Sequence, residues 1–197
     1  LNYRFDTGAG NVAFDSSGNG LNGSRVNAPA WIPGQLGSAL SFDGAGAYVD
    51  SGVSTDLAEW TVAFWVRSPS APARGAANGP VHRERNFAIS WDHPAATFRG
   101  AAAMRAGGNW YAASFGSLAA DTWYHLTATY DGETLKAYTN GVLVTANASP
   151  AGAPDPEVAT MTVGRHAKSQ SFFAGDVDEL RIYQRALTPA EIDALTP

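Results

Sequence analysis

Cysteine is absent from the 197-residue chain, so no disulfide bond can stabilise its fold. An extracellular domain of this kind must rely on core packing or on a bound metal. No apolar run approaches the roughly 20 residues of a transmembrane helix, which predicts that the chain has no membrane span. The opening residues, LNYRFD, are not a signal peptide, so we expect a targeting segment to have been removed or to lie in a longer parent chain.

Positive charge is also in short supply. The chain has 13 lysine and arginine residues against 18 aspartate and glutamate residues, a formal net charge of -5. No run of lysine or arginine gathers the positive charge in one segment. A phosphate backbone would require such a basic surface, so we expect no binding to nucleic acid.

Glycine (21 residues), proline (11) and aromatic residues (11%) are frequent in a chain that is 45% hydrophobic. This composition favours short strands joined by tight turns over helices. Turn signals recur about every 8 to 12 residues, and no repeat or second domain is evident. We therefore predict a single all-β domain over residues 1–197, an antiparallel two-sheet β-sandwich of roughly a dozen short strands.

Three stretches carry the strongest local signals. Residues 59–67, EWTVAFWVR, have apolar side chains on both strand faces, which predicts a central strand covered on both sides. Asn140–Gly141 between alternating runs indicates a type I′ hairpin. Residues 188–191 form a capping box with proline at the first helical position, so one short C-terminal helix is expected to run through Leu195.

The stretch Gly175–Tyr183, GDVDELRIY, has the period of a strand, but its acids conflict with that period. In a straight strand, Asp178 would face the core together with Leu180. Alternatively, Val177 faces inward with Leu180, and a bulge at Asp178–Glu179 absorbs the extra residue. In both arrangements Asp178 needs a partner, because an unpaired buried carboxylate is strongly unfavourable.

Residues 11–23, NVAFDSSGNGLNG, form a turn-rich loop that offers hard oxygen ligands. Asp15, Asn19 and Asn22 supply side-chain oxygens, and the intervening glycines let the backbone fold back, which suits calcium. The alternative is a plain multiple turn in which the same side chains cap the loop's own backbone. The loop sequence leaves both possibilities open.

Three further strands, 86–92, 97–105 and 109–115, are predicted to form a meander. One face would carry a shallow strip of small residues that a ligand or another layer could approach closely, formed by Ala88, Ser90, Gly100 or Ala101, Ala103, and Ala112 or Ala113. Residues 68–85 lack periodicity and are expected to be a long connection, either mobile or functional.

Six blocks of sequence, in their order and spacing, resemble the laminin-G-like domains of the concanavalin A-like lectin/glucanase superfamily found in bacterial extracellular proteins. They are FDSSGNGLNG (14–23), ALSFDGAGAYVD (39–50), WTVAFWVR (60–67), TWYHLTATYDG (122–132), LKAYTNGVLV (135–144) and GDVDELRIYQRALTPAEIDAL (175–195). The resemblance implies a jelly-roll sandwich of two sheets. It also implies a structural Ca2+ ion that ties the N-terminal loop to the closing strand, with Asp15, Asn19, Asn22 and Asp178 as its ligands.

The family is functionally broad and includes carbohydrate-binding, adhesion and some hydrolase domains, so the resemblance does not fix the activity. In the related glucanases, the carboxylates occupy alternating positions on one strand face. Here Glu179 breaks the alternation of Asp176 and Asp178, so we expect no catalysis. The absence of a Gly-x-Ser-x-Gly motif and the scattered histidines argue against a serine nucleophile and against zinc.

Carbohydrate binding would depend on aromatic rings stacked on sugar C–H faces, with polar groups bonded to the hydroxyls. Trp65, Trp123 and Tyr130 are expected in the core. Candidate ligand contacts lie at strand ends and loops, namely Trp91, Asp92, His93, Arg99, Asn109, Trp110 and Tyr111. Trp91 could instead cap the core beside Phe87 and Ile89.

The sequence thus predicts a non-catalytic polysaccharide-binding module with one structural calcium. We expect it to be a monomeric part of a larger secreted enzyme or cell-surface protein of bacterial type. A protein-interaction or adhesion domain is the alternative, and a glycoside hydrolase is less favoured than either.

Overall fold

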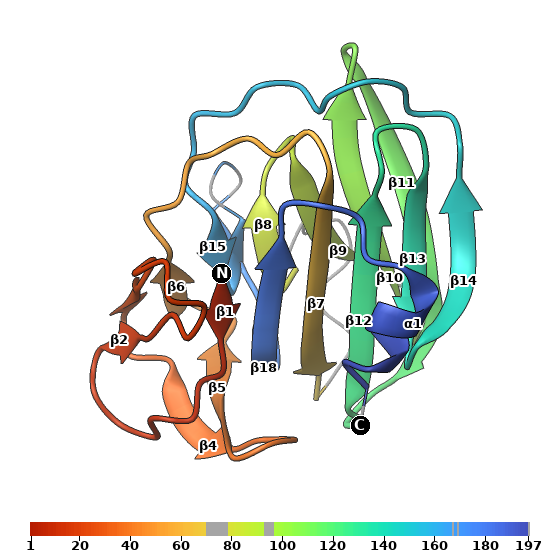
Figure 1. The fold of residues 1–197 in the computed structure, drawn as a ribbon. Helices are drawn as coiled ribbons and strands as arrows, with labels where there is room; N and C mark the ends of the chain where they lie inside the picture. Colours follow the sequence, from red (N-terminus) through yellow and green to blue (C-terminus); the bar gives the residue numbers. More distant parts are fainter. Residues whose placement is uncertain (70–78, 93–96, 167, 169, 197) are drawn as a thin grey trace.

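The computed structural model describes residues 1–69, 79–92, 97–166, 168 and 170–196. Two large antiparallel sheets face each other, and one short helix packs on the outer face of one of them (Figure 1). The predicted all-β sandwich with a C-terminal helix is confirmed.

Sheet A consists of β1 (Asn2–Tyr3), β4 (Ala30–Pro33), β5 (Ser38–Asp43), β7 (Trp60–Arg67), β12 (Tyr124–Tyr130), β13 (Leu135–Thr139), β14 (Val142–Asn147) and β18 (Ala174–Tyr183). Its strand order is β14-β13-β12-β7-β18-β5-β4, and β1 also pairs with β18. The position of β7 between β12 and β18 confirms the prediction of a central strand.

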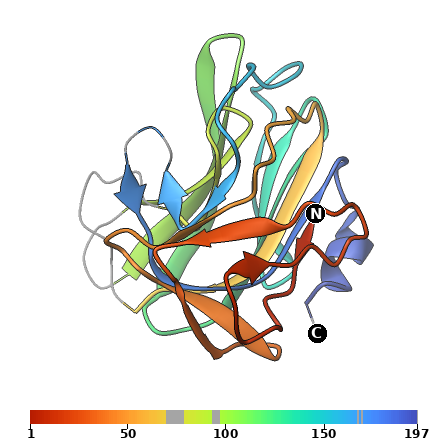
Figure 2. The ribbon, with the colours of Figure 1, turned by 90° about the vertical axis from the view of Figure 1, so that its left-hand side faces the viewer.

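Sheet B consists of β2 (Val12–Ala13), β3 (Gly23–Val26), β6 (Tyr48–Asp50), β8 (Val81–Arg83), β9 (Phe87–Asp92), β10 (Thr97–Ala106), β11 (Asn109–Ala119) and β15 (Thr162–Val163). Its order is β11-β10-β9-β8-β15-β6-β3-β2. A separate hairpin of β16 (Arg165–His166) and β17 (Ser171–Phe172) stands beside the sandwich (Figure 2).

The closing strand β18 contains the bulge that its sequence allowed. Its register with β7 shifts between Asp178 and Arg181, and Glu179 adopts a φ of 49°. Val177 and Leu180 are both fully buried although three positions separate them. The bulge turns both apolar side chains inward, so the straight-strand alternative is wrong.

Two local predictions at the C-terminal end of the chain are also confirmed. Asn140 and Gly141 have φ values of 49° and 79°, as a type I′ turn between β13 and β14 requires. The helix α1 (Pro189–Asp193) begins with the capping box of Thr188 and Glu191 and ends two residues before the predicted end at Leu195.

The main core lies between the two sheets. Trp65 and Tyr130 are buried as expected, whereas Trp123 is only half-buried and its ring lies 5.0 Å from the guanidinium carbon of Arg67. No helix among the described residues is long and apolar enough to cross a membrane.

Candidate functional site

The outer face of sheet B carries the predicted strip of small residues. Ala101 pairs with Ser90, and Ala103 pairs with both Ala88 and Ala112. Side chains on paired positions share one face of a sheet. Ala102, the residue between the two alanines of β10, is fully buried and faces the core.

Trp110 is the large apolar residue at the end of this face. Its side chain is 52% exposed, and it pairs across the β10–β11 hairpin with Arg105. A hollow of about 350 Å³ opens beside the ring and is lined by Glu84, Arg85, Arg105, Gly108, Trp110 and Lys168. The site therefore combines a ring face with several charged hydrogen-bonding groups.

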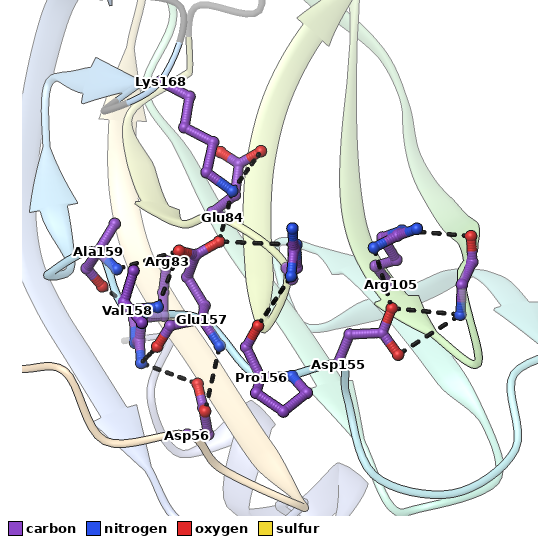
Figure 3. Close-up of polar contacts among 12 residues, drawn as sticks. Asp56, Arg83, Glu84, Arg105, Asp155, Pro156, Glu157, Val158, Ala159 and Lys168 are labelled. Atoms are coloured by element: carbon purple, nitrogen blue, oxygen red, sulfur yellow. Dashed lines mark hydrogen bonds and ion pairs between the residues drawn. The ribbon is translucent and has the colours of Figure 1, made fainter.

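One connecting segment, Asp155–Glu157, holds the charged residues of this hollow (Figure 3). The Asp155 carboxylate lies 3.2 Å from Arg105 Nη1, and the Pro156 carbonyl accepts a hydrogen bond of 3.1 Å from Arg85 Nη1. The Glu157 carboxylate lies 2.7 Å from Lys168 Nζ. Three consecutive residues thus fix three cations that come from different parts of the chain.

Glu157 is the most strongly held of these acids. It accepts hydrogen bonds from the backbone N–H groups of Val158 and Ala159 and forms the ion pair with Lys168. Although burial acts in the opposite direction, these contacts lower the pKa of Glu157 to about 2. The carboxylate stays ionised over the whole working range of pH.

Below the segment lies a buried arginine, Arg83, at the end of β8. Its guanidinium donates to the backbone carbonyls of Ser54, Glu157 and Ala159, and it forms a 2.8 Å ion pair with Asp56 (Figure 3). Arg83 therefore joins the loop after β6, the end of β8 and the segment that carries the hollow's acids.

Trp91 does not share the outer face with Trp110. It is 4% exposed and belongs to the core cluster, with its ring 6.1 Å from that of Phe173. A side chain at Gly100 would collide with the Trp91 ring, so the glycine leaves the space that the ring fills. The alternative in which Trp91 caps the core with Phe87 and Ile89 matches this position, and ligand cannot stack on a ring buried there.

The other predicted ligand contacts differ in exposure and position. Asn109 is exposed beside Trp110, while Tyr111 is partly buried and packs against the core. The backbones of Asp92 and Arg99 pair with each other across β9 and β10, which keeps both positions on neighbouring strands. His93 lies outside the described residues.

The hollow contains four charged residues that the candidate set omitted, Glu84, Arg85, Arg105 and Lys168. One pattern in the sequence indicates two of them, because HRER at residues 82–85 concentrates charge at the end of the long connection. Lys168 had no such signal, since only the tertiary structure brings it beside Glu157.

The predicted calcium ligands fall into two separate places. Asp15 lies in the N-terminal loop and accepts hydrogen bonds from the N–H groups of Asn2, Ser17 and Leu21 and from the Ser17 hydroxyl. Asn22 Oδ1 accepts from Asp15 N, and Asn19 Nδ2 donates to Ser17 Oγ. These contacts form the self-capped turn that was the alternative for this loop.

Asp178 contacts a different loop. It is fully buried and accepts hydrogen bonds from the N–H groups of Leu36 and Glu179, at 2.9 and 2.8 Å. Burial raises the pKa of Asp178 to about 6. No contact among the described residues joins it to the Asp15 loop, and a calcium ion shared by the four residues stays a prediction. Asp178 alone among them is a buried carboxylate without an ion-pair partner among the described residues.

The two acids beside Asp178 form ion pairs with arginines. Asp176 lies 2.8 Å from Arg67 Nε, and Glu179 lies within 3.3 Å of Arg4 Nε and within 2.5 Å of Arg181 Nη2. All three acids of this stretch are buried within the sandwich. None of them lines the hollow beside Trp110.

Another hollow, of about 370 Å³, lies at the end of the sandwich near loop 51–57. Its single aromatic lining residue, Phe87, is buried, so this hollow offers no exposed ring for stacking. The hollow beside Trp110 is therefore the better candidate for sugar recognition.

Fold and topology define the class of protein as a two-sheet antiparallel β-sandwich. The family model of the concanavalin A-like lectin/glucanases superfamily matches residues 43–193, and the chain belongs to this superfamily. No curated protein matches the chain in sequence.

Several solved structures share the fold. Domain 4 of AbnA, a GH43 extracellular arabinanase from Geobacillus stearothermophilus solved with arabinotriose, has 23% identity and a TM-score of 0.74, with 100% of this chain and 97% of that chain covered. The binding domain of Paraclostridial mosquitocidal protein 1 has 17% identity and a TM-score of 0.68, with 93% and 48% covered. A pentraxin from Limulus polyphemus has 14% identity and a TM-score of 0.57, with 80% of each chain covered. At these identities the likeness concerns the fold.

Proposed function

We propose that this chain is a non-catalytic polysaccharide-binding module and that its binding surface is the outer face of sheet B around Trp110. The observation that carries the proposal is the half-exposed Trp110 ring at the rim of a hollow lined by charged donors and acceptors. Such a ring stacks on the C–H face of a sugar while the donors bond to its hydroxyls.

Other observations support this function. Ala101, Ala103 and Ala112 have small side chains that project little from the sheet beside the ring. An extended polysaccharide chain can therefore lie along this face. The arabinanase domain with the same fold was solved with a bound arabinose oligomer. We propose that the module belongs to a larger secreted enzyme or surface protein.

Trp110→Ala should weaken retention on the recognised glycan about tenfold, because an aromatic stacking contact contributes on the order of 1 kcal/mol or more. Affinity electrophoresis against a panel of soluble polysaccharides measures this retention. Leu143→Ala is the matched control, since Leu143 is 50% exposed on β14 of sheet A. Equal retention of both variants on a bound glycan would place the site elsewhere.

A protein-interaction or adhesion domain is the second candidate function. It is favoured by the exposed Val142, Leu143 and Val144 on β14, which lies at the edge of sheet A. An exposed apolar edge strand can pair with another chain. Absence of retention on every glycan of the panel would favour this function over carbohydrate binding.

We propose Asp178 as a ligand of the structural calcium, because its buried carboxylate has no ion-pair partner among the described residues. A calcium ion beside this buried carboxylate would supply the charge that no described side chain provides. Calcium should raise the melting temperature, chelation should lower it, and Asp178→Asn should remove the response. Asp15→Asn serves as the comparison, because its carboxylate caps a turn. Indifference of the wild-type melting temperature to both treatments would refute a bound calcium.

A further inference from the structure

We propose that the hollow beside Trp110 takes an acidic polysaccharide, one whose sugars carry carboxylate or sulfate groups. The inference rests on the proposed glycan binding and adds the charge of the ligand. It follows from the difference in exposure between the positive and the negative side chains at the hollow.

The cations of the hollow are held in place by contacts within the protein. Arg85 follows β8, Arg105 lies on β10 and Lys168 follows β16, so three distant segments each contribute one positive group. The backbone brings two of them together, because Arg105 N donates to the Arg85 carbonyl at 2.8 Å. Arg85 Nε and Lys168 Nζ approach the same oxygen of Glu157, at 3.8 and 2.7 Å.

Exposure separates the two signs of charge. The side chains of Arg85, Arg105 and Lys168 are 37%, 30% and 45% exposed. The acids that hold them, Asp155 and Glu157, are 19% and 2% exposed. Glu84, the third acid of the hollow, is 11% exposed and pairs with His166 Nε2 at 3.1 Å. A ligand in the hollow therefore meets mainly positive groups, although the charges balance in number.

The acids also accept hydrogen bonds from backbone N–H groups. Asp155 accepts a hydrogen bond from Gly108 N, and Glu157 accepts from two backbone N–H groups. These bonds hold the carboxylates below the cations and leave further guanidinium N–H groups of Arg85 and Arg105 for a ligand. A carboxylate or sulfate accepts such donors as charge-assisted hydrogen bonds.

The attraction is local, because the whole chain has a formal charge of -5. A polyanion approaching elsewhere on the protein would be repelled on average, so binding has to occur where the cations are gathered. The contribution of such partly exposed cations is screened by salt.

A polysaccharide fits this surface better than single-stranded nucleic acid. Nucleic-acid channels combine a long basic groove with several stacking rings. Trp110 is the one exposed tryptophan among the described residues, and the cations form a single group beside it.

The test compares polymers that differ in charge and share a backbone. Isothermal titration calorimetry with polygalacturonate and its methyl ester, and with dextran sulfate and dextran, separates carboxylate from sulfate recognition. We expect at least tenfold tighter binding to one acidic polymer than to its neutral counterpart, and we expect this preference to shrink at high salt.

Two substitutions test whether the hollow is responsible. Lys168→Gln should weaken binding of the acidic polymer about fivefold to tenfold and leave binding of the neutral polymer unchanged. Lys136→Gln is the control, because Lys136 is also a partly exposed lysine paired with an acid, Asp131 at 3.0 Å, but it lies on β13 of sheet A. Melting curves of both variants check that the loss is not caused by unfolding, since Lys168 supports the buried Glu157.

The outcomes are distinct. Equal affinity for acidic and neutral polymers, or an equal effect of the two lysine substitutions, overturns the charge inference and leaves glycan binding intact. Tighter binding of single-stranded DNA than of either acidic polymer also overturns it. If no polysaccharide binds at all, acidic or neutral, the proposed function itself fails.

Discussion

Replacement of Arg83 by methionine is expected to lower the free energy of unfolding by about 3–5 kcal/mol, because the buried guanidinium donates hydrogen bonds to three backbone carbonyls and to one carboxylate. Methionine fills part of the volume but donates no hydrogen bond. The Glu157 carbonyl would lose its donor in the buried interior, the Ser54 and Ala159 carbonyls would lose theirs at partly buried positions, and Asp56 would lose its cation. A net contribution of about 1 kcal/mol for each lost hydrogen bond accounts for this total.

The effect should extend to the candidate site. Arg83 holds the backbone of Glu157, and Glu157 in turn holds Lys168 and lies near Arg85. Ligand binding should therefore weaken in Arg83→Met even at temperatures where the variant remains folded. Urea denaturation gives the stability, and calorimetry of the folded variant gives the affinity.

Arg105→Met is the control for this prediction. Arg105 is 30% exposed and its ion pair with Asp155 borders solvent, so its removal should cost no more than about 1 kcal/mol. Equal loss of stability in the two methionine variants would contradict the role assigned to the buried network.

A second large effect is expected in acid. His82 is 1% exposed, its ring packs 4.7 Å from that of His166, and neither of its ring nitrogens has a hydrogen-bond partner among the described residues. Burial, with a smaller contribution from the positive charge of His166, lowers the pKa of His82 to about 3. The folded protein therefore keeps this ring neutral where the unfolded chain, with a histidine pKa of about 6.5, takes up a proton.

The direction of the effect follows from proton linkage. Between pH 6.5 and pH 3 the unfolded state binds more protons than the folded state at this residue, so stability falls as the pH falls. Each pH unit removes up to about 1.4 kcal/mol, which gives a loss of about 3 kcal/mol at pH 4. His125, whose pKa is lowered to about 4 by burial and by Arg181, acts in the same direction.

His82→Leu tests this prediction, because leucine has a similar volume and no charge. The variant should be close to wild-type stability at pH 7 and more stable than wild type at pH 4, as measured by urea denaturation at both values. In the protein without calcium, Asp178 acts oppositely: its pKa, raised by burial, makes stability fall as the pH rises from about 4 through 6. The comparison between variant and wild type isolates His82 from that opposing change. An unchanged difference between the two at pH 7 and pH 4 would exclude the histidine as an acid-labile group.

Residue preferences and side-chain patterns predicted the elements that depend on residues close together in the sequence. The Asn140–Gly141 turn, the capping box before α1 and the burial of β7 follow from backbone preference and side-chain pattern alone. The bulge in β18 was one of two arrangements that the pattern allowed. Pairing with β7 selected it, because Val177 and Leu180 had to enter the same core.

The candidate site was only partly predictable. Trp110 and the strip of small residues on β9, β10 and β11 follow from strand alternation and from the glycine turn between β10 and β11. Trp91 lies on β9, two strands from the β11 strand of Trp110 in the same meander, yet its ring faces the core. The space above Gly100 that receives this ring depends on the register between β9 and β10, which no short sequence window contains.

The sequence by itself determined that this chain is an all-β sandwich with one capped helix, and it pointed to Trp110 as a surface ring. Only the tertiary structure decided which charges surround that ring, because Arg85, Arg105 and Lys168 are gathered by the distant segment Asp155–Glu157. The two results differ for a physical reason. Strand pattern and turn chemistry act between near neighbours, whereas ion pairs and burial depend on contacts that exist only after the sheets have packed.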